Sequence, residues 1–347
     1  MRSRVCRLHG KKDLRIENDD VKSPRSGEVL VQLAYGGICG SDMHYFADGG
    51  IGTIRVQEPI ILGHEASGQI AAVGDEIHHL KAGDLVAINP SRPCGTCKFC
   101  QDNLFMHCLE MRFNGSAIRL PHEQGLFRDF MILDSTQCIK VPSNVDLAAL
   151  ACAEPLAVCL HAASIAGNLA NKRILITGAG PIGALCTSVA KTYGADEIVV
   201  TDIHDQTLDI AKKMGASECI NVATDPQKKV EKYALNKGYF DVAFECSAAA
   251  SAIKTAVNSL LPRGSLIQVG VAGDTSVPIN AIVAKEIKFQ GTHRFHKEFD
   301  EAVRAISDGK INVHPILSGV FDLQDIDHAF SVAMDRSKSV KIQLKFN

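Results

Sequence analysis

The stretch ILITGAGPIGALC, residues 174–186, decides the fold of this chain. Its first residues are typical of a buried strand, and Gly178, Gly180 and Gly183 follow in the spacing G-x-G-x-x-G before a pattern of helical length. Glycines at these places permit a tight turn, a close backbone approach to a pyrophosphate and close packing of helix on strand. The helix N-terminus also faces the phosphate charge. The stretch therefore predicts a strand, turn and helix that bind a dinucleotide.

The residues after this motif support a nucleotide site. Asp202 ends the next expected strand, 19 residues beyond Gly183, where a carboxylate can accept hydrogen bonds from the adenosine ribose. Ile203, His204 and Asp205 follow, and none of them is a cation that would hold a 2′-phosphate, so we expect NAD to be preferred over NADP. The expected cofactor-binding residues are Gly178, Gly180, Pro181, Ile182, Gly183 and Asp202.

Strands alternate with helical patterns on both sides of this unit. The helical patterns lie at 182–193, 206–214 and 248–260. Strands with such helical crossovers form a doubly wound parallel sheet, which has helices on both faces. The expected strands are residues 173–177, 197–201, 218–221, 240–245, 265–269 and 287–291.

The first 150 residues have a different texture, with short β-rich runs such as 28–35, 65–73 and 84–89 between glycine-rich turns. After residue 291 we expect helices at 297–307 and 324–334 and a last strand at 340–346. This tail is too short for a domain, so we expect it to return to the first one. The expected division is 1–155 with 295–347, and 156–294 as the dinucleotide-binding domain.

Composition excludes several classes of protein. The chain has 347 residues, 46% of them hydrophobic, with 37 basic and 39 acidic residues and a net charge of −2. No global positive field favours nucleic acid or anionic lipid. The basic N-terminus lacks the apolar run of a signal peptide, and Asp146, Glu154 and His161 interrupt the most apolar stretch. We therefore expect a cytoplasmic protein with no membrane span, whose twelve cysteines are metal ligands or buried thiols rather than disulfides.

Four of these cysteines are close together. Cys94, Cys97, Cys100 and Cys108 form C-x2-C-x2-C-x7-C in a loop that contains proline and glycine. Four thiolates at this spacing are typical of a structural zinc site with no open position. An iron–sulfur cluster is the alternative, but the fourth cysteine comes late and lacks the following proline.

A second set of possible ligands is dispersed along the chain: Cys39, His64, Glu65 and Glu154. Thiolate, imidazole and carboxylate all bind zinc, and three protein ligands with one open position define a catalytic zinc site. Taken singly, a cysteine is usually a small buried hydrophobic residue, and a histidine is usually a residue whose ring nitrogens are hydrogen-bonded. Spacing alone does not show that these segments meet.

At these residues the chain resembles the medium-chain zinc-dependent alcohol and polyol dehydrogenases over essentially its whole length. The family signature G-H-E-x2-G-x5-G is matched from Gly63 to Gly74. The segments GGICGSDMHY (36–45), EPLAV (154–158) and HRF (293–295) resemble the sorbitol dehydrogenase branch. The segments NPSRPCGTCKFC (89–100), MRFNGSA (111–117) and NKGYFDVAFE (236–245) are similar to bacterial enzymes that oxidise L-idonate.

The resemblance implies a mainly β, GroES-like catalytic domain joined to a Rossmann domain. It implies that Cys39 and His64 bind catalytic zinc, and it leaves Glu65 and Glu154 as alternative third ligands, of which we favour Glu65 with Glu154 adjacent. Cys152 is expected to be packed away.

The resemblance also implies roles in proton transfer and substrate binding. Ser41 and His44 pass the substrate proton to solvent, and Asp42 orients His64. A sugar acid needs hydroxyl partners and a cation, for which the candidates are Tyr45, Arg112 and Arg294.

We expect reversible oxidation of L-idonate to 5-ketogluconate with NAD, and about two zinc ions per chain. A sorbitol or xylitol dehydrogenase is the first alternative. A nucleotide-binding protein without catalysis, or a zinc-free quinone reductase relative, is a remote one. The edge of the last parallel strand, 287–291, is expected to pair with a second copy in a homodimer or homotetramer.

Overall fold

The computed structural model describes residues 1–224, 228–271 and 273–346. Six parallel strands form one sheet in the order β15-β14-β13-β16-β17-β18, with the glycine motif directly after the central strand β13. The expected fold class, an α/β chain with a β-rich domain and a doubly wound parallel sheet, is confirmed. The strands are β13 (Arg173–Thr177), β14 (Glu197–Asp202), β15 (Glu218–Asn221), β16 (Phe240–Glu245), β17 (Leu260–Gln268) and β18 (Lys288–Gly291).

Both faces of this sheet are covered. Ile174 and Ile176 of β13 belong to one buried cluster, whereas Leu175 belongs to another on the opposite face. This alternation follows from the two-residue period of a strand, and it explains why residues 174–176 of β13 are all apolar. The covering helices are α4 (Ala153–Ala166), α5 (Pro181–Thr192), α6 (Asp205–Lys213), α7 (Lys228–Glu231), α8 (Ala250–Ser259) and α9 (Ile279–Lys285).

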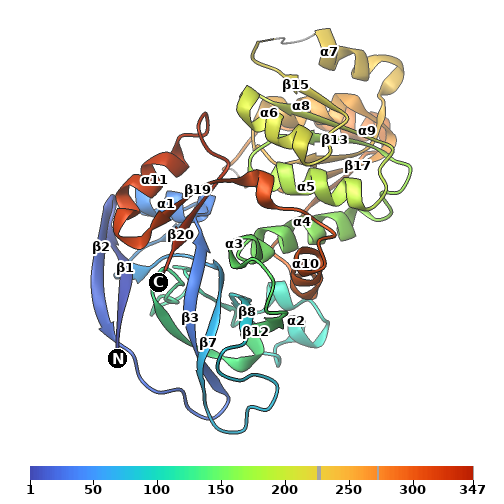
Figure 1. The fold of residues 1–347 in the computed structure, drawn as a ribbon. Helices are drawn as coiled ribbons and strands as arrows, with labels where there is room; N and C mark the ends of the chain where they lie inside the picture. Colours follow the sequence, from blue (N-terminus) through green and yellow to red (C-terminus); the bar gives the residue numbers. More distant parts are fainter. Residues whose placement is uncertain (225–227, 272, 347) are drawn as a thin grey trace.

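The other half of the molecule is built on a seven-stranded sheet in the order β12-β8-β7-β3-β20-β19, with β11 also paired to β3. The last strand β20 pairs with β3, so the chain returns to its N-terminal half, and Figure 1 places both termini in that half. The strands are β3 (Glu28–Gly37), β7 (Glu65–Val73), β8 (Leu85–Ile88), β11 (Phe130–Asp134), β12 (Cys138–Val141), β19 (Leu317–Asp322) and β20 (Lys341–Lys345).

Short elements complete this half. The hairpin of β1 and β2 joins β6, and a separate pair of strands frames the four-cysteine loop. The elements are β1 (Arg2–Gly10), β2 (Asp13–Asp20), β4 (Gly50–Ile51), β5 (Ile54–Arg55), β6 (Ile60–Ile61), β9 (Ser91–Arg92), β10 (Arg112–Phe113), α1 (Gly40–Asp48), α2 (Lys98–Gln101), α3 (Leu147–Leu150), α10 (Glu298–Ser307) and α11 (Ile326–Met334).

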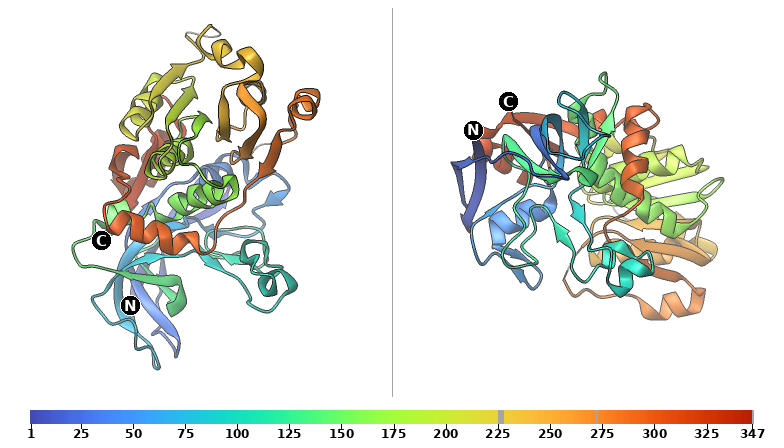
Figure 2. Two further views of the ribbon diagram at one scale, coloured as in Figure 1. Left: turned by 90° about the vertical axis from the view of Figure 1, so that its right-hand side faces the viewer. Right: turned by 90° about the horizontal axis from the view of Figure 1, so that it is seen from below.

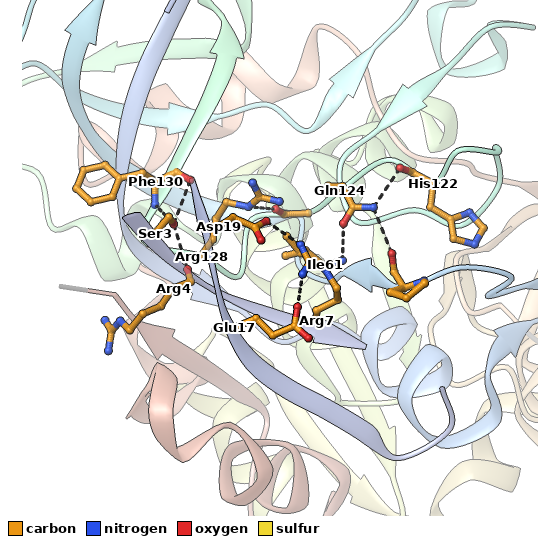
Figure 3. Close-up of polar contacts among 12 residues, drawn as sticks. Ser3, Arg4, Arg7, Glu17, Asp19, Ile61, His122, Gln124, Arg128 and Phe130 are labelled. Carbon is orange, nitrogen blue, oxygen red and sulfur yellow. Dashed lines mark hydrogen bonds and ion pairs between the residues drawn. The ribbon is translucent and has the colours of Figure 1, made fainter. Parts of the chain in front are cut away.

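Polar contacts fix the β1–β2 hairpin to residues 122–130, as Figure 3 shows. Arg7 bonds Asp19 across the hairpin at 2.7 Å, and Ser3 Oγ accepts a hydrogen bond from Phe130 N at 3.0 Å. Gln124 accepts one from Ile61 N at 2.9 Å. These contacts hold residues 122–130 in place. The same segment bonds the backbone of Leu62 and Gly63, and so supports the turn directly before His64.

Helices α4 and α10 lie side by side where the two halves meet (Figure 2), and His161 Nδ1 of α4 is 3.1 Å from Glu298 Oε1 of α10. Helix α4 begins at Ala153, so the division expected after residue 155 would cut its first turn. Among the described residues, no helix is both long enough and apolar enough to span a bilayer.

Candidate active site

The glycine turn after β13 has the geometry that a dinucleotide requires. Gly178 has φ of 89°, a conformation that side-chain-bearing residues rarely adopt, and a Cβ on Gly183 would lie 1.8 Å from Gly178 O. Gly180 is the N-cap of α5, whose first residue is Pro181 and whose second is Ile182. The turn therefore presents backbone N–H groups and a helix N-terminus at the carboxyl end of the sheet, where open α/β sheets bind ligands.

Asp202 stands beside this turn at the end of β14. One of its oxygens accepts from Ala179 N at 2.6 Å, and the other accepts from Ile203 N at 2.7 Å and His204 N at 3.0 Å. The carboxylate is therefore fixed in position, and it retains lone pairs for a ribose hydroxyl.

The four cysteines of the loop, Cys94, Cys97, Cys100 and Cys108, have sulfur atoms that all lie within 4.8 Å of one another. The Sγ atom of Cys97 is 3.6 Å from that of Cys100 and 4.0 Å from that of Cys108. Sulfurs bound to one tetrahedral zinc lie about 3.8 Å apart, so the donor set fits the ion. Hydrogen bonds from Thr96, chiefly from its backbone N–H, lower the pKa of Cys94 to about 6, which favours the thiolate that binds metal.

A second metal-competent set consists of Cys39, His64 and Glu65, whose ligand atoms also lie within 4.8 Å of one another. Cys39 is the N-cap of α1, Glu65 is the first residue of β7 and His64 directly precedes it, so segments far apart in sequence meet here. A thiol, an imidazole and a carboxylate leave one tetrahedral position free, which is the donor set of a catalytic zinc site.

Asp42 holds two parts of this set in place from a fully buried position. It accepts hydrogen bonds from Cys39 N at 2.9 Å and from Gly63 N at 3.1 Å, and its Oδ1 lies 3.8 Å from His64 Nδ1. Gly63 has φ of 91°, and a Cβ there would lie 2.2 Å from the Phe127 ring. This turn therefore needs glycine directly before His64.

Glu65 is positioned by two residues whose importance the sequence did not reveal. Lys341 of β20 is buried, and its Nζ is 2.7 Å from each carboxylate oxygen of Glu65 and 3.2 Å from Ile38 O. A Cβ on Gly37 would lie only 1.9 Å from Glu65 Oε2. The carboxylate occupies space that exists because residue 37 has no side chain, and its remaining lone pairs are available to a metal.

Glu154 lies in the first turn of α4, close enough to this set for His64, Glu65, Lys341 and Arg294 to affect its ionisation. Burial is the largest effect and raises the pKa of Glu154 to about 7. Within the described part of the chain, the carboxylate whose oxygen lies within 4.8 Å of the ligand atoms of both Cys39 and His64 is that of Glu65 and not that of Glu154. Cys152, directly before this helix, is buried and accepts a hydrogen bond from Gln343 Nε2 at 3.7 Å.

A cavity of about 220 Å³ lies next to the second set, between the four-cysteine loop and residues 293–294. Phe113 lines it and is 5.5 Å from His64 between ring centroids. Arg294 also lines it, with its guanidinium carbon 4.1 Å from the centre of the Phe113 ring. Across the described residues no hydrogen bond or ion pair engages this guanidinium, and Arg294 has φ of 53°, the left-handed region that side chains disfavour.

The loop that carries Arg294 is braced against the four-cysteine loop. Phe105, in the 3-10 helix 105–107, stacks on His296 with 3.9 Å between ring centroids, and His107 stacks on His293 at 5.9 Å. Arg294 is therefore held between two ring contacts, which offsets the strain of its backbone.

The other residues expected to bind substrate or transfer its proton are not among those that line this cavity. Ser41 is half-buried on α1, while His44 is exposed, with Nδ1 3.1 Å from Asp48 Oδ2. Tyr45 is buried, and its hydroxyl accepts from Ala117 N at 3.2 Å. Arg112 is half exposed, ion-paired with Glu123 and outside the set of residues that line the cavity. Its position gives no support to a role in carboxylate binding.

Comparison with known proteins shows the family of this chain. Residues 25–143 match the alcohol dehydrogenase GroES-like domain, and residues 181–308 match the zinc-binding dehydrogenase family. The chain is 39% identical to L-idonate 5-dehydrogenase (NAD(P)(+)) of Escherichia coli strain K12, across 100% of this chain and 99% of that protein. The chain belongs to the zinc-dependent alcohol dehydrogenase family. This dehydrogenase is an NAD(P)-dependent oxidoreductase that uses zinc and acts on a small molecule.

A second relative and two solved structures are also similar to this dehydrogenase. D-xylulose reductase A of Aspergillus niger is 34% identical over 310 residues, which cover 87% of this chain and 85% of that protein. The crystal structure of the E. coli L-idonate 5-dehydrogenase superposes with a TM-score of 0.94 and covers 100% of this chain and 99% of that one. The structure of 2R,3R-butanediol dehydrogenase from Bacillus subtilis is 25% identical in sequence, with a TM-score of 0.89. The match covers 99% of this chain and 100% of that one.

Proposed function

We propose that this dehydrogenase oxidises a secondary alcohol of a sugar acid, with L-idonate as substrate and 5-ketogluconate as product. The reverse reduction uses the same site. Identity of 39% to L-idonate 5-dehydrogenase along the whole chain supports the choice of substrate. The observation that carries the sugar-acid assignment is the Arg294 guanidinium in the cavity. It has no ion-pair partner among the residues that the structure describes, and such a cation is suited to bind a carboxylate.

Cys39, His64 and Glu65 would hold the catalytic zinc, with Glu154 beside it, and the four-cysteine loop would hold a structural zinc. Bound zinc would supply Lewis acidity that makes a substrate hydroxyl more acidic, and the nicotinamide would accept the hydride. Asp42 would fix the orientation of the His64 ring. Ser41 would take the proton of the reacting hydroxyl, and the exposed His44 would release it to solvent.

We propose that the coenzyme pyrophosphate lies on the turn of Gly178, Gly180 and Gly183, with Pro181 and Ile182 at the start of α5. Asp202 would accept bonds from the adenosine ribose, and its charge would repel a 2′-phosphate, so NAD would be preferred over NADP. A measured preference of kcat/KM for NADP would contradict this part of the proposal.

Steady-state kinetics on L-idonate, sorbitol and xylitol test the substrate. We expect L-idonate to have the highest kcat/KM, and Arg294→Gln to lower that value about 100-fold while lowering the value for xylitol less than tenfold, because only the acid loses a charge-assisted bond. Arg112→Gln is the matched control and should leave the ratio of the two substrates unchanged. A preference for an uncharged polyol, or equal losses on both substrates in Arg294→Gln, would reject the sugar-acid assignment.

A polyol dehydrogenase that acts on sorbitol or xylitol is the second candidate, and the similarity to D-xylulose reductase A favours it. In either case the Tyr45 hydroxyl, which accepts a hydrogen bond from Ala117 N, would keep its own proton to donate to a substrate hydroxyl. The same kinetic comparison separates the two candidates.

We further propose a cytoplasmic homodimer or homotetramer. All four residues of β18 are exposed, and β18 is the edge of the parallel sheet, so its unpaired backbone groups can join those of a second copy. Exposed Ile279, Val283 and Phe289 lie on α9 and β18 and would be covered in that contact. Sedimentation velocity would distinguish a monomer from either assembly.

A further inference from the structure

The four-cysteine loop borders the cavity that contains Arg294. Met106, His107 and Cys108 of this loop line that cavity, and Cys108 is one of the four residues that would hold the structural zinc. A closed zinc site of this kind ordinarily stabilises a fold and takes no part in the reaction. Here the loop and Arg294 face one cavity, so the conformation of the loop bears on how a substrate is held.

The segment that carries Arg294 is fixed by hydrogen bonds at its two ends. Thr292 N donates to Gln268 O at 3.1 Å, and His296 N donates to Glu298 Oε2 at 3.0 Å. Between these ends Arg294 has φ of 53°, a backbone conformation that persists only where the surroundings enforce it. Contacts from other parts of the molecule must therefore hold Arg294 in this conformation.

Two ring contacts from the four-cysteine loop supply that restraint. Phe105 stacks on His296 with 3.9 Å between ring centroids and 25° between ring planes, and His107 stacks on His293 at 5.9 Å. The two histidines flank Arg294, because His293 directly precedes it and His296 follows two residues later. A shift of either ring therefore turns the backbone from which the guanidinium projects.

Ring contacts restrain Arg294 without neutralising it. An acid that restrained Arg294 by an ion pair would compete with the carboxylate of a substrate, whereas stacked rings leave the donors of the guanidinium free. The other charged residues that line the cavity are already engaged, since Glu123 is paired with Arg112 and Arg119 is paired with Glu110. The arrangement thus fixes one cation and keeps it available.

We propose that the four-cysteine loop sets the preference of this dehydrogenase for a sugar acid over a polyol, with Phe105 as a positioning residue that acts through His296 on Arg294. The inference rests on the proposed function, in which Arg294 binds the substrate carboxylate. A guanidinium displaced by about 1 Å loses the paired geometry that a carboxylate needs, while an uncharged polyol loses little.

The test is a double-mutant cycle on the zinc-loaded enzyme, with kcat and KM measured for L-idonate and for xylitol. We expect Phe105→Ala to raise KM for L-idonate about tenfold and to leave kcat for L-idonate and KM for xylitol within about twofold, because the carboxylate bond is made equally in the ground state and the transition state. Phe105→Tyr retains the ring and should restore the parent KM. In the Arg294→Gln background, Phe105→Ala should raise KM for L-idonate less than about twofold, since the two residues act as one unit.

Leu104→Ala is the matched control, because it removes an exposed apolar side chain next to Phe105 that does not line the cavity. It should leave KM for both substrates unchanged. Bound zinc should stay at about two ions per chain in Phe105→Ala, as measured by mass spectrometry of the dialysed protein. If Phe105→Ala loses zinc, His296→Ala takes its place in the cycle, because it removes the same stack from the side away from the cysteines.

Two results would overturn the inference while Arg294→Gln remains selective for the acid. One is an equal rise of KM for L-idonate and xylitol in the variant that lacks the stack, and the other is a tenfold rise that persists in the Arg294→Gln background. Equal losses on both substrates in Arg294→Gln alone would instead reject the proposed function, and this inference with it.

Discussion

At the scale of single residues, the candidate zinc site of Cys39, His64 and Glu65 depends on the absence of a side chain at Gly37. Glu65 is a buried carboxylate that contacts the ammonium of Lys341 and occupies the space that a side chain on Gly37 would fill. The family signature points to Glu65, but nothing in the sequence indicates that Gly37 must lack a Cβ. Its role comes from the pairing of β3 with β7, which brings Gly37 opposite Glu65.

Replacement of this glycine is therefore a sharp test. Gly37→Ala places a methyl group where Glu65 Oε2 lies, so the carboxylate must move away from Cys39 and His64. We expect at least a 100-fold loss of kcat/KM and a fall in bound zinc from about two ions per chain toward one. Zinc is measured by mass spectrometry of the dialysed protein.

Gly10→Ala serves as the control, because no atom lies within 4 Å of the added Cβ. It should retain both ions and full activity. Retention of two zinc ions and parent activity in Gly37→Ala would show that Glu65 does not depend on this space.

Other residues show how far sequence reasoning reached. The glycine motif, the four cysteines and the set of Cys39, His64 and Glu65 were found from spacing or resemblance, and each forms a cluster. Lys341 was not found, because a lysine in a short strand is ordinarily a surface residue. The interpretation of Arg112 as a substrate residue gains no support from its pairing with Glu123, and that pairing was not visible in the sequence.

At the scale of elements, the strands β13 and β14 were predicted well because each is a run rich in β-branched residues and is bounded by turn residues. β17 is the exception, since it begins at Leu260 rather than at 265, and Pro262 and Gly264 within it conceal the start. The β1–β2 hairpin was missed altogether. Its strands carry many charged residues that pair across the hairpin, so they lack clear apolar alternation.

Helices α4 and α10 provide a prediction on pH, because His161 of α4 contacts the buried carboxylate of Glu298 of α10. Burial opposes ionisation of Glu298, but hydrogen bonds from His161 and from His296 N outweigh it and lower the pKa of Glu298 to about 2. A carboxylate with a lowered pKa contributes stability above its ordinary pKa and loses it as pH falls toward 2.

We therefore expect Glu298→Gln to lower the free energy of unfolding by about 2 kcal/mol at pH 6, a difference that shrinks as the pH falls from 5 toward 3. Urea unfolding across this range measures it. Asp300→Asn, in the same helix but exposed, should show little change at any pH. A difference for Glu298→Gln that is constant with pH would mean that the pair does not hold the carboxylate ionised.

At the scale of the whole molecule, the chain crosses between its halves twice, and both crossings bring residues to the active site. The first leads through α4, which carries Glu154. The second follows β18, with Arg294 in the loop and Lys341 in the last strand. The sequence predicted this return from the length of the tail, but which residues would face one another depends on how the halves pack. Resemblance supplied that pairing, and physical reasoning from the residues alone did not.

The account rests on distant segments that together form a zinc site beside the coenzyme. Anomalous diffraction at the zinc edge, from crystals grown with zinc, tests it most directly. The account predicts two peaks per chain, one among the four cysteines and one about 2.0–2.3 Å from Cys39 Sγ, a His64 ring nitrogen and a Glu65 oxygen. A single peak at the cysteines, or a second peak bonded to Glu154 in place of Glu65, would contradict it.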